Sequence, residues 1–240
     1  MSKKRQPRRV MGLAVLFLFA WCGFTPAQKE SSRTQIVLLG TGTPAPDPEH
    51  SGPSTAIVVN GTPYLVDFGT GLVRQAAAAR KKGVAGLEPA NLRIGFLTHL
   101  HSDHTLGFPD LILTPWVVGR KEPLEVYGPP GTSVMAENIL KAYTEDINIR
   151  TVVKISTGEM ENSSSAGYKV NVHEIVPGVV FKDQNVTVTA FAVHHGKWAH
   201  AYGYRFETPD RTIVISGDTR SDTAIVDNCH EVERGPGFVQ

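Results

Sequence analysis

Cysteine, excess charge and long apolar runs are all scarce in this chain of 240 residues. Cysteine occurs twice, and because Cys22 lies in the N-terminal segment discussed below, Cys229 alone remains for the mature chain and no intrachain disulfide is expected. The formal net charge is only +1, and no basic patch occurs outside the N-terminus, which argues against a nucleic-acid partner. The sequence has no internal repeat of solenoid period. With 41% apolar and 20% charged residues, the composition is that of an ordinary globular domain.

The N-terminal apolar run, residues 10–24, is too short for a comfortable membrane span. Five basic residues precede it, and the small-residue stretch Thr25-Pro26-Ala27 follows it, a pattern typical of a secretory signal peptide. We therefore expect residues 1–27 to be removed, the mature domain of residues 28–240 to be periplasmic or secreted, and no stable membrane span to remain. A retained signal anchor is the alternative.

The most informative segment is residues 98–104, which read THLHSDH and place four potential metal ligands in the order His-x-His-x-Asp-His. Apolar residues just before the motif indicate a buried strand. Side chains at positions i and i+2 of an extended segment share a face, so His99 and His101 can bind one ion together. Asp103 and His104 follow at the turn and can present ligands to a second ion. Imidazole and carboxylate suit zinc, or manganese or iron; a solvated His-rich loop is the alternative.

Apolar and β-branched runs bounded by turn residues predict the other elements. Strands are expected at residues 35–39, 55–59, 64–67, 92–97, 124–127, 168–176, 186–193, 201–206 and 211–216. Helices are expected at residues 71–82, 107–118 and 132–143. The order is typical of a layered α/β/β/α sandwich.

The metal motif resembles that of the metallo-β-lactamase fold superfamily, whose members carry it at the end of a strand. Further similar segments are residues 39–44 (LGTGTP), 52–55 (GPST), 65–69 (LVDFG), 193–196 (VHHG), 201–206 (AYGYRF) and 213–219 (IVISGDT). In this order they are similar to the branch that contains ribonuclease Z and zinc-dependent arylsulfatase-like hydrolases, over about residues 34–228. The resemblance implies an α/β protein with the αββα sandwich of that superfamily.

The resemblance also implies the roles of the site residues. The first ion is bound by His99, His101 and His195, the second by Asp103 and His104, and Asp218 bridges both. Two zinc ions are expected, and such a pair activates water for attack on an ester. Asp103 is in addition the predicted catalytic residue, because its carboxylate can orient the nucleophile by accepting a hydrogen bond.

Other polar and aromatic residues are given supporting roles. Asp67 is expected to hold the metal loop in place without binding metal. His194 alternates to the other face of its strand from His195, which favours a packing or supporting role. His173 is expected to be structural. His200 is a candidate to line the substrate cleft, although a structural role is favoured. Trp116 and Trp198 are candidates to line an apolar pocket, although packing is the more common role of such residues.

The C-terminal segment departs from the pattern of the proteins that this chain resembles. Those proteins continue past the Ser-Gly-Asp-Thr turn through an apolar strand, helices and a last histidine that completes the second metal site. Here the apolar strand is missing from the sequence pattern, and His230-Glu231 follows too soon. We therefore expect a truncated or altered C-terminus, a second ion that lacks one ligand, and apolar surface exposed near residues 213–215.

Three functions are consistent with the sequence. The leading hypothesis is an exported metal-dependent hydrolase of small phosphate or sulfate esters, with no nucleic-acid partner. The alternative is an endonuclease of the ribonuclease Z type that acts at the 3′ end of tRNA; the export signal and the near-neutral charge argue against it. The third is an impaired protein that binds at most one ion. The oligomeric state cannot be predicted.

Overall fold

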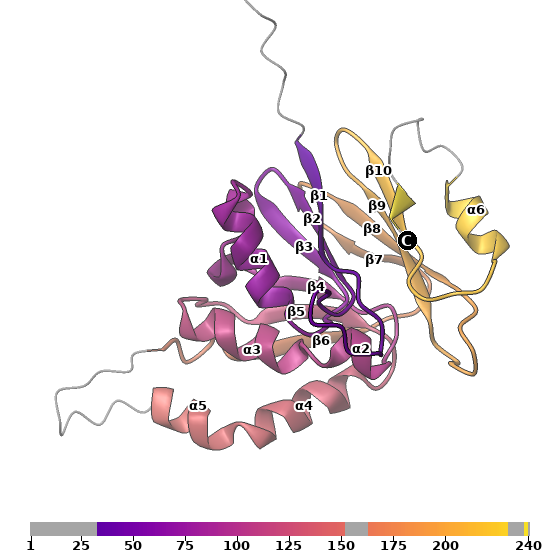
Figure 1. Cartoon of the computed structure of the whole chain (residues 1–240). Helices are drawn as coiled ribbons and strands as arrows, with labels where there is room; N and C mark the ends of the chain where they lie inside the picture. The colour runs from indigo at the N-terminus through magenta and orange to yellow at the C-terminus, as the bar shows by residue number, and fades with distance from the viewer. Residues whose placement is uncertain (1–32, 152–162, 230–237, 240) are drawn as a thin grey trace, which may run out of the picture. The chain divides into compact units, whose positions relative to one another are not determined.

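Two β-sheets form the centre of the domain, in a computed structural model that describes residues 33–151, 163–229 and 238–239 (Figure 1). The first sheet has the strand order β1-β2-β3-β4-β5-β6. Its strands are β1 (Thr34–Gly40), β2 (Ser54–Val59), β3 (Thr62–Val66), β4 (Ile94–Phe96), β5 (Leu124–Gly128) and β6 (Val170–Glu174). The second has the order β11-β10-β9-β8-β7. Its strands are β7 (Gly178–Lys182), β8 (Thr187–Ala192), β9 (Tyr202–Glu207), β10 (Thr212–Ile215) and β11 (Phe238–Val239).

The first sheet changes from antiparallel to parallel at β3. Strands β1, β2 and β3 pair antiparallel, and β2 and β3 are joined at Asn60-Gly61. Both residues have positive φ, 49° and 81°, as a two-residue hairpin requires. From β3 to β6 the pairing is parallel, so the carboxyl ends of β3, β4 and β5 lie at one edge of the sheet. Loops at this edge of a parallel sheet are the usual place for a functional site.

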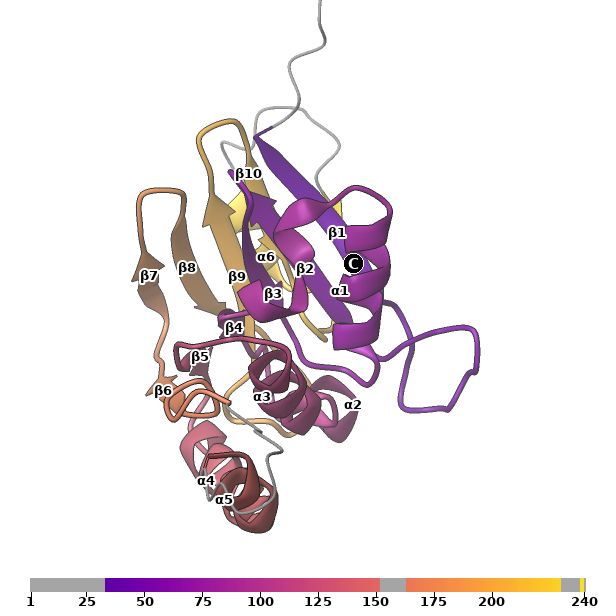
Figure 2. The same cartoon turned by 90° about the vertical axis from the view of Figure 1, so that its left-hand side faces the viewer.

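Helices cover the outer face of the first sheet: α1 (Leu72–Lys81), α3 (Phe108–Val117) and α4 (Thr132–Ala142). Leu72 on α1 and Leu111 on α3 are fully buried in one apolar cluster with Val58 and Leu65 of the sheet. Figure 2 shows α1 and α3 in front of this sheet. The helices therefore form the first outer layer of the sandwich.

Apolar side chains from both sheets fill the space between them. Ile57 and Phe96 of the first sheet share a buried cluster with Val188, Phe206 and Ile213 of the second. All six residues of β2 are buried, because alternate side chains face the helices and the other sheet. The layered sandwich predicted from the order of strands and helices is therefore confirmed.

The outer face of the second sheet is covered by α6 (Thr223–Cys229). Ala224 and Ile225 of this helix pack against Val193 and Val214, and Val214 is only 5% exposed. The expectation of exposed apolar surface near residues 213–215 is therefore wrong. The backbone of β11 pairs in parallel with β10, at residues that follow His230-Glu231 in the chain.

Elements that escape prediction from the sequence include α5 (Thr144–Thr151), β7, β11 and α6. The α6 sequence TAIVDNC consists largely of residues with low helix propensity, and packing stabilises it instead. β7 is an edge strand on which Val179 remains 65% exposed. Apolar and polar residues therefore do not alternate regularly along its sequence. The other predicted elements are confirmed within a few residues at each end.

The predicted signal peptide, residues 1–27, lies outside the described residues and stays a prediction, as does the extent of the mature domain. Within the part of the chain that the structure describes, no helix combines the length and the apolar character that crossing a membrane demands.

Candidate metal centre

The metal motif follows β4 at the carboxyl edge of the first sheet. β4 lies between the parallel strands β3 and β5, and its chain continues through Thr98 and His99 into the one-turn helix α2 (Ser102–Thr105). Tyr204 of the second sheet donates a hydrogen bond from its hydroxyl to the Leu97 carbonyl at 2.7 Å. The buried strand and this contact fix the start of the motif, so its histidines leave the sheet in a defined direction.

Asp67, at the end of β3, supports the motif from behind. Its carboxylate accepts hydrogen bonds from the Thr98 backbone at 2.8 Å and from the Thr98 hydroxyl, and it lies 2.8 Å from Nδ1 of His104. The backbone of Asp67 has φ 61°, which is unfavourable for a residue with a side chain. Contacts with the surrounding residues must therefore stabilise this conformation. Asp67 thus has the geometry of a support for the metal loop, the role expected from the sequence.

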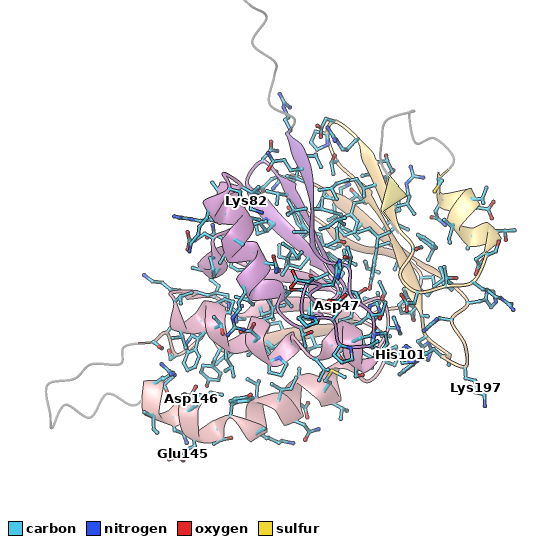
Figure 3. The ribbon with its side chains drawn as sticks, in the orientation of Figure 1. Asp47, Lys82, His101, Glu145, Asp146 and Lys197 are labelled. Carbon is cyan, nitrogen blue, oxygen red and sulfur yellow. The ribbon has the colours of Figure 1, made fainter. Side chains whose placement is uncertain are left out.

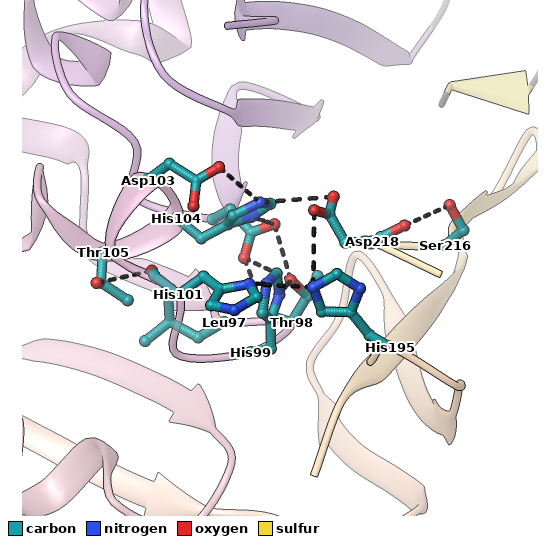
Figure 4. Close-up of polar contacts among 12 residues, drawn as sticks. Leu97, Thr98, His99, His101, Asp103, His104, Thr105, His195, Ser216 and Asp218 are labelled. Carbon is teal, nitrogen blue, oxygen red and sulfur yellow. Dashed lines mark hydrogen bonds and ion pairs between the residues drawn. The ribbon is translucent and has the colours of Figure 1, made fainter. Parts of the chain in front are cut away.

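Three histidines converge beside this loop (Figure 4). Nε2 of His99 lies 2.9 Å from Nδ1 of His101, and Nε2 of His195 lies 3.0 Å from the same atom. The three ligand atoms all lie within 4.8 Å of one another. His195 is 94 residues from His101 in the chain and comes from the loop after β8. The structure therefore brings together the three residues predicted to bind the first ion.

A second group of ligand atoms consists of His99, His104 and Asp218, so His99 belongs to both groups. Nε2 of His104 lies 3.5 Å from an oxygen of Asp218 and 3.5 Å from an oxygen of Asp103. Asp218 also lies 4.0 Å from Nε2 of His195. Among the described residues Asp103 falls outside both groups, although its carboxylate faces His104.

Asp218 reaches the centre because Gly217 lets its loop approach the first sheet closely. Gly217 has φ 59°, and a Cβ atom there would lie 2.8 Å from the Thr98 side chain. The Tyr202 backbone N–H at the start of β9 donates a hydrogen bond to the Thr98 carbonyl at 2.9 Å. This hydrogen bond connects the second sheet to the residue before His99. It therefore fixes the ligands from the two sheets relative to each other.

The electrostatics of the centre fit a divalent cation. Nε2 of His104 is buried and has no hydrogen-bond partner in the described part of the chain, although three carboxylates surround the ring: Asp67, Asp103 and Asp218. Burial alone would lower the pKa of His104, but the Asp218 and Asp67 carboxylates raise it to about 10. The carboxylates therefore favour a positive charge at this point, and a bound cation would supply it.

His99 has the opposite tendency. Burial and the neighbouring His104 lower its pKa to about 3, so the ring is neutral near pH 7. Its Nδ1 lies 2.9 Å from the Thr98 hydroxyl, which leaves Nε2 facing the other ligand atoms. A neutral imidazole held by a hydrogen bond at its other nitrogen is the usual form of a histidine ligand. The residues present therefore fit a divalent metal ion.

Several other residues have the positions that the sequence suggested. The His194 side chain is 69% exposed and turns to Asp222 instead of the histidine cluster. His173 stacks on Tyr127 with ring centroids 4.4 Å apart, away from the centre. His200 is exposed, with Nδ1 3.5 Å from the Tyr202 hydroxyl. These three histidines have no direct part in the centre.

Two features of the centre escape prediction. Trp198 places its Nε1 2.7 Å from Nε2 of His101, so the indole lies against the cluster and not in an apolar pocket of its own. A cavity of about 500 Å³ opens beside the centre, lined by His195, Ser216, Asp218, Arg220 and neighbouring residues of the same loop. Neither has a local sequence signal, because both depend on loops from separate strands.

The family model described as "Beta-lactamase superfamily domain" matches residues 62–233. The match covers more than half of the chain and includes every predicted site residue, so the chain belongs to the beta-lactamase superfamily.

More particular relatives are ribonucleases. Ribonuclease Z of Mycobacterium marinum is 36% identical over 188 residues, which cover 77% of this chain and 63% of the relative. Ribonuclease Z of Mycobacterium bovis is 35% identical over 188 residues, 77% of this chain and 62% of the relative. The chain thus spans less than two thirds of the length of these relatives.

Solved structures confirm the fold. The short form of human tRNase Z superposes with a TM-score of 0.62 at 24% identity, covering 82% of this chain and 74% of that one. The metallo-β-lactamase fold protein YhfI from Bacillus subtilis has a TM-score of 0.56 at 15% identity, over 79% and 65% of the two chains. The predicted metallo-β-lactamase αββα sandwich is therefore correct.

The relatives overturn one expectation. The near-neutral net charge led us to expect no nucleic-acid partner, whereas the relatives are named for cleavage of RNA. Net charge sums charges of both signs over the whole chain and does not report how they are placed around one site. Lys197 and Arg220 both lie on loops that carry site residues, and the net charge of the chain does not show this.

Proposed function

We propose that this chain is a metal-dependent endoribonuclease of the ribonuclease Z type that cleaves phosphodiester bonds at the 3′ end of tRNA precursors. The observation that carries the proposal is the combination of 36% identity to ribonuclease Z with two groups of ligand atoms that share His99. A hydrolase of small phosphate or sulfate esters is the alternative, but the 36% identity is to a ribonuclease Z.

The residues of the centre have separable tasks. His99, His101 and His195 would hold one ion, and His104 with Asp103 and Asp218 would hold the other. Zinc is the metal proposed, and divalent ions bound there would supply Lewis acidity toward a phosphoryl oxygen and lower the pKa of a water molecule. Asp67 keeps Nδ1 of His104 engaged, so that Nε2 faces Asp103 and Asp218. A carboxylate oxygen of Asp103 would orient the attacking water by accepting its hydrogen bond.

The cavity beside His195 and Asp218 offers space for the RNA backbone. Arg220 lines this cavity, and Lys197 precedes Trp198, whose indole contacts His101. Figure 3 shows the Lys197 side chain extending outward from the molecule. Phosphate contacts by such cations position an RNA chain without reading its sequence. Lys197 and Arg220 therefore support a polyanionic substrate.

The test uses the purified full chain, stripped with a chelator and reloaded with Zn²⁺ or Mn²⁺. A tRNA precursor with a 3′ trailer is the substrate, and the same tRNA with a mature 3′ end is the control. We expect cleavage at the trailer junction only with metal, loss of cleavage in His99→Ala, and near-normal cleavage in His173→Ala, whose ring lies away from the centre. A loaded chain that hydrolyses an aryl phosphodiester or aryl sulfate but leaves the precursor intact would refute the RNA assignment.

A further inference from the structure

His194 ties the loop that carries His195 to the loop that carries Asp218. Its backbone N–H donates to Oδ2 of Asp222 at 3.1 Å, and its Nδ1 lies 2.6 Å from the same oxygen. Its carbonyl accepts hydrogen bonds from the Arg220 backbone at 3.1 Å and from the Thr219 hydroxyl at 3.2 Å. Every polar position of His194 except Nε2 is thus engaged by the segment that follows Asp218.

These contacts matter because the sheet itself does not connect the two loops. His195 follows β8 and Asp218 follows β10, and β9 lies between these strands in the sheet. No ladder of hydrogen bonds can therefore join β8 to β10 directly. The distance of 4.0 Å between Nε2 of His195 and the Asp218 carboxylate depends on how the loops meet beyond the end of β9.

Asp222 is the centre of this junction. Its side chain is only 7% exposed, whereas its partner His194 is 69% exposed. Its other oxygen, Oδ1, accepts a hydrogen bond from the Ala224 backbone at 3.0 Å at the start of α6. The helix packs through Ala224 and Ile225 on Val193, the residue before His194. One carboxylate thus joins the helix and both loops.

We propose that Asp222 is a positioning residue that acts through His194 to set the separation of His195 and Asp218, and thereby the metal affinity of the centre. The proposal rests on the metal centre assigned above. Asp222 touches no reacting atom in this scheme, and its effect reaches the centre only through the two loops. Partners of this kind commonly change metal affinity by about 10–100-fold when they are replaced.

The isosteric variant Asp222→Asn separates positioning from folding. An Asn side chain keeps Oδ1 as the N-terminal cap of α6, since asparagine caps helices as well as aspartate does. It places an NH₂ group where Oδ2 now accepts the backbone N–H of His194, so that one donor faces another and the backbone contact is lost. His194→Ala removes only the side-chain half of the contact. Cys229→Ala serves as the structural control, because Cys229 packs in the same cluster under α6 but does not touch the junction.

The experiment titrates the chelated full chain with Co²⁺ alone and records the visible ligand-field spectrum, together with thermal unfolding of the metal-free protein. We expect Asp222→Asn to lower Co²⁺ affinity about tenfold or more and to change the spectrum. His194→Ala should lower Co²⁺ affinity by a smaller factor. The double variant should lose no more Co²⁺ affinity than Asp222→Asn alone. Cys229→Ala should lower the melting temperature while leaving affinity and spectrum unchanged.

Two outcomes overturn the inference in different ways. Wild-type affinity and spectrum in Asp222→Asn would refute the positioning role alone and leave the proposed function standing. A wild-type chain that binds no Co²⁺ would refute the metal centre itself, and with it both proposals. Equal losses of affinity in Asp222→Asn and Cys229→Ala would show that general loosening of α6 is the cause, which also overturns the specific role.

Discussion

The Asp67 carboxylate lies 2.8 Å from Nδ1 of His104, and both side chains are buried. This contact orients the imidazole so that Nε2 faces Asp103 and Asp218, each 3.5 Å away. Because Asp67 also accepts two hydrogen bonds from Thr98, it links the orientation of His104 to the position of His99 in the same motif. One residue at the end of β3 thus controls ligands of both groups.

Replacing Asp67 with Asn should weaken metal binding more than it weakens the fold. Asparagine tolerates the positive φ at this position, so the backbone can persist. The amide oxygen can still accept the hydrogen bonds from Thr98, but the NH₂ group that replaces the other oxygen cannot accept a hydrogen bond from Nδ1 of His104. We expect metal affinity to fall by about 10–100-fold, measured by competition with a chromophoric chelator. Asp47→Asn, at an exposed loop residue paired with His50, is the control and should bind metal as the wild type does.

Gly217→Ala should damage stability and the centre together. Its φ of 59° disfavours any side chain, and the new Cβ atom would meet Thr98 at 2.8 Å and the Tyr202 carbonyl at 3.1 Å. We expect a loss of about 2–4 kcal/mol in the free energy of unfolding, from backbone strain plus the collision. Gly61 also has a positive φ, 81°, but a Cβ atom there would meet nothing within 4 Å. Gly61→Ala should therefore lose only the unfolding free energy that the backbone strain costs. Urea denaturation of both variants measures how much unfolding free energy the collision with Thr98 costs beyond the backbone strain. Equal losses of unfolding free energy in the two variants would show that the collision contributes nothing.

Phe96→Ala should destabilise the interface between the sheets. Phe96 is fully buried and its ring lies 5.2–5.9 Å, centroid to centroid, from four aromatic rings: Tyr127, Phe181, Tyr204 and Phe206. The cavity left behind should cost about 3–5 kcal/mol of unfolding free energy. Val179→Ala, at a residue that is 65% exposed, should change it by less than about 0.5 kcal/mol. A loss below about 1 kcal/mol for Phe96→Ala would mean that the sheets repack.

Lys197→Ala and Arg220→Ala should weaken RNA binding with little effect on the chemical step. Each removes one cation from a loop that carries site residues, so under the proposed function KM for the tRNA precursor should rise while kcat changes little. The slope of log affinity against log salt should fall by about 1 for each phosphate that the variant no longer neutralises. Lys82→Ala, at the end of α1, is the matched control for loss of one positive charge (Figure 3). A lower kcat with unchanged KM would place these residues in the chemistry instead.

The sequence predicts the parts of this protein whose signals are local. The ligands of residues 98–104 are close in the chain, and strand alternation alone places His99 and His101 on one face. Strand β2 contains the continuous apolar run of residues 56–59 because both of its faces are covered, and that run is visible without a structure.

What the sequence does not reveal depends on contacts between distant segments. The pairing of His194 with Asp222 spans 28 residues and has no motif of its own. α6 has weak intrinsic helix propensity and forms where it can cover Val193 and Val214. The sharing of His99 between two ligand groups follows from the angle at which the loops meet, which no local pattern specifies.

The anchoring of the Tyr202 backbone on the Thr98 carbonyl has a consequence for how the chain matures. His99, His101 and His104 come from one sheet, while His195 and Asp218 come from the other, so the full ligand set exists only after the sheets have docked. Before docking, the nascent polypeptide offers only the weak binding of the short motif. The two groups of ligand atoms that share His99 are therefore completed only at a late step of folding, when the two sheets have come together.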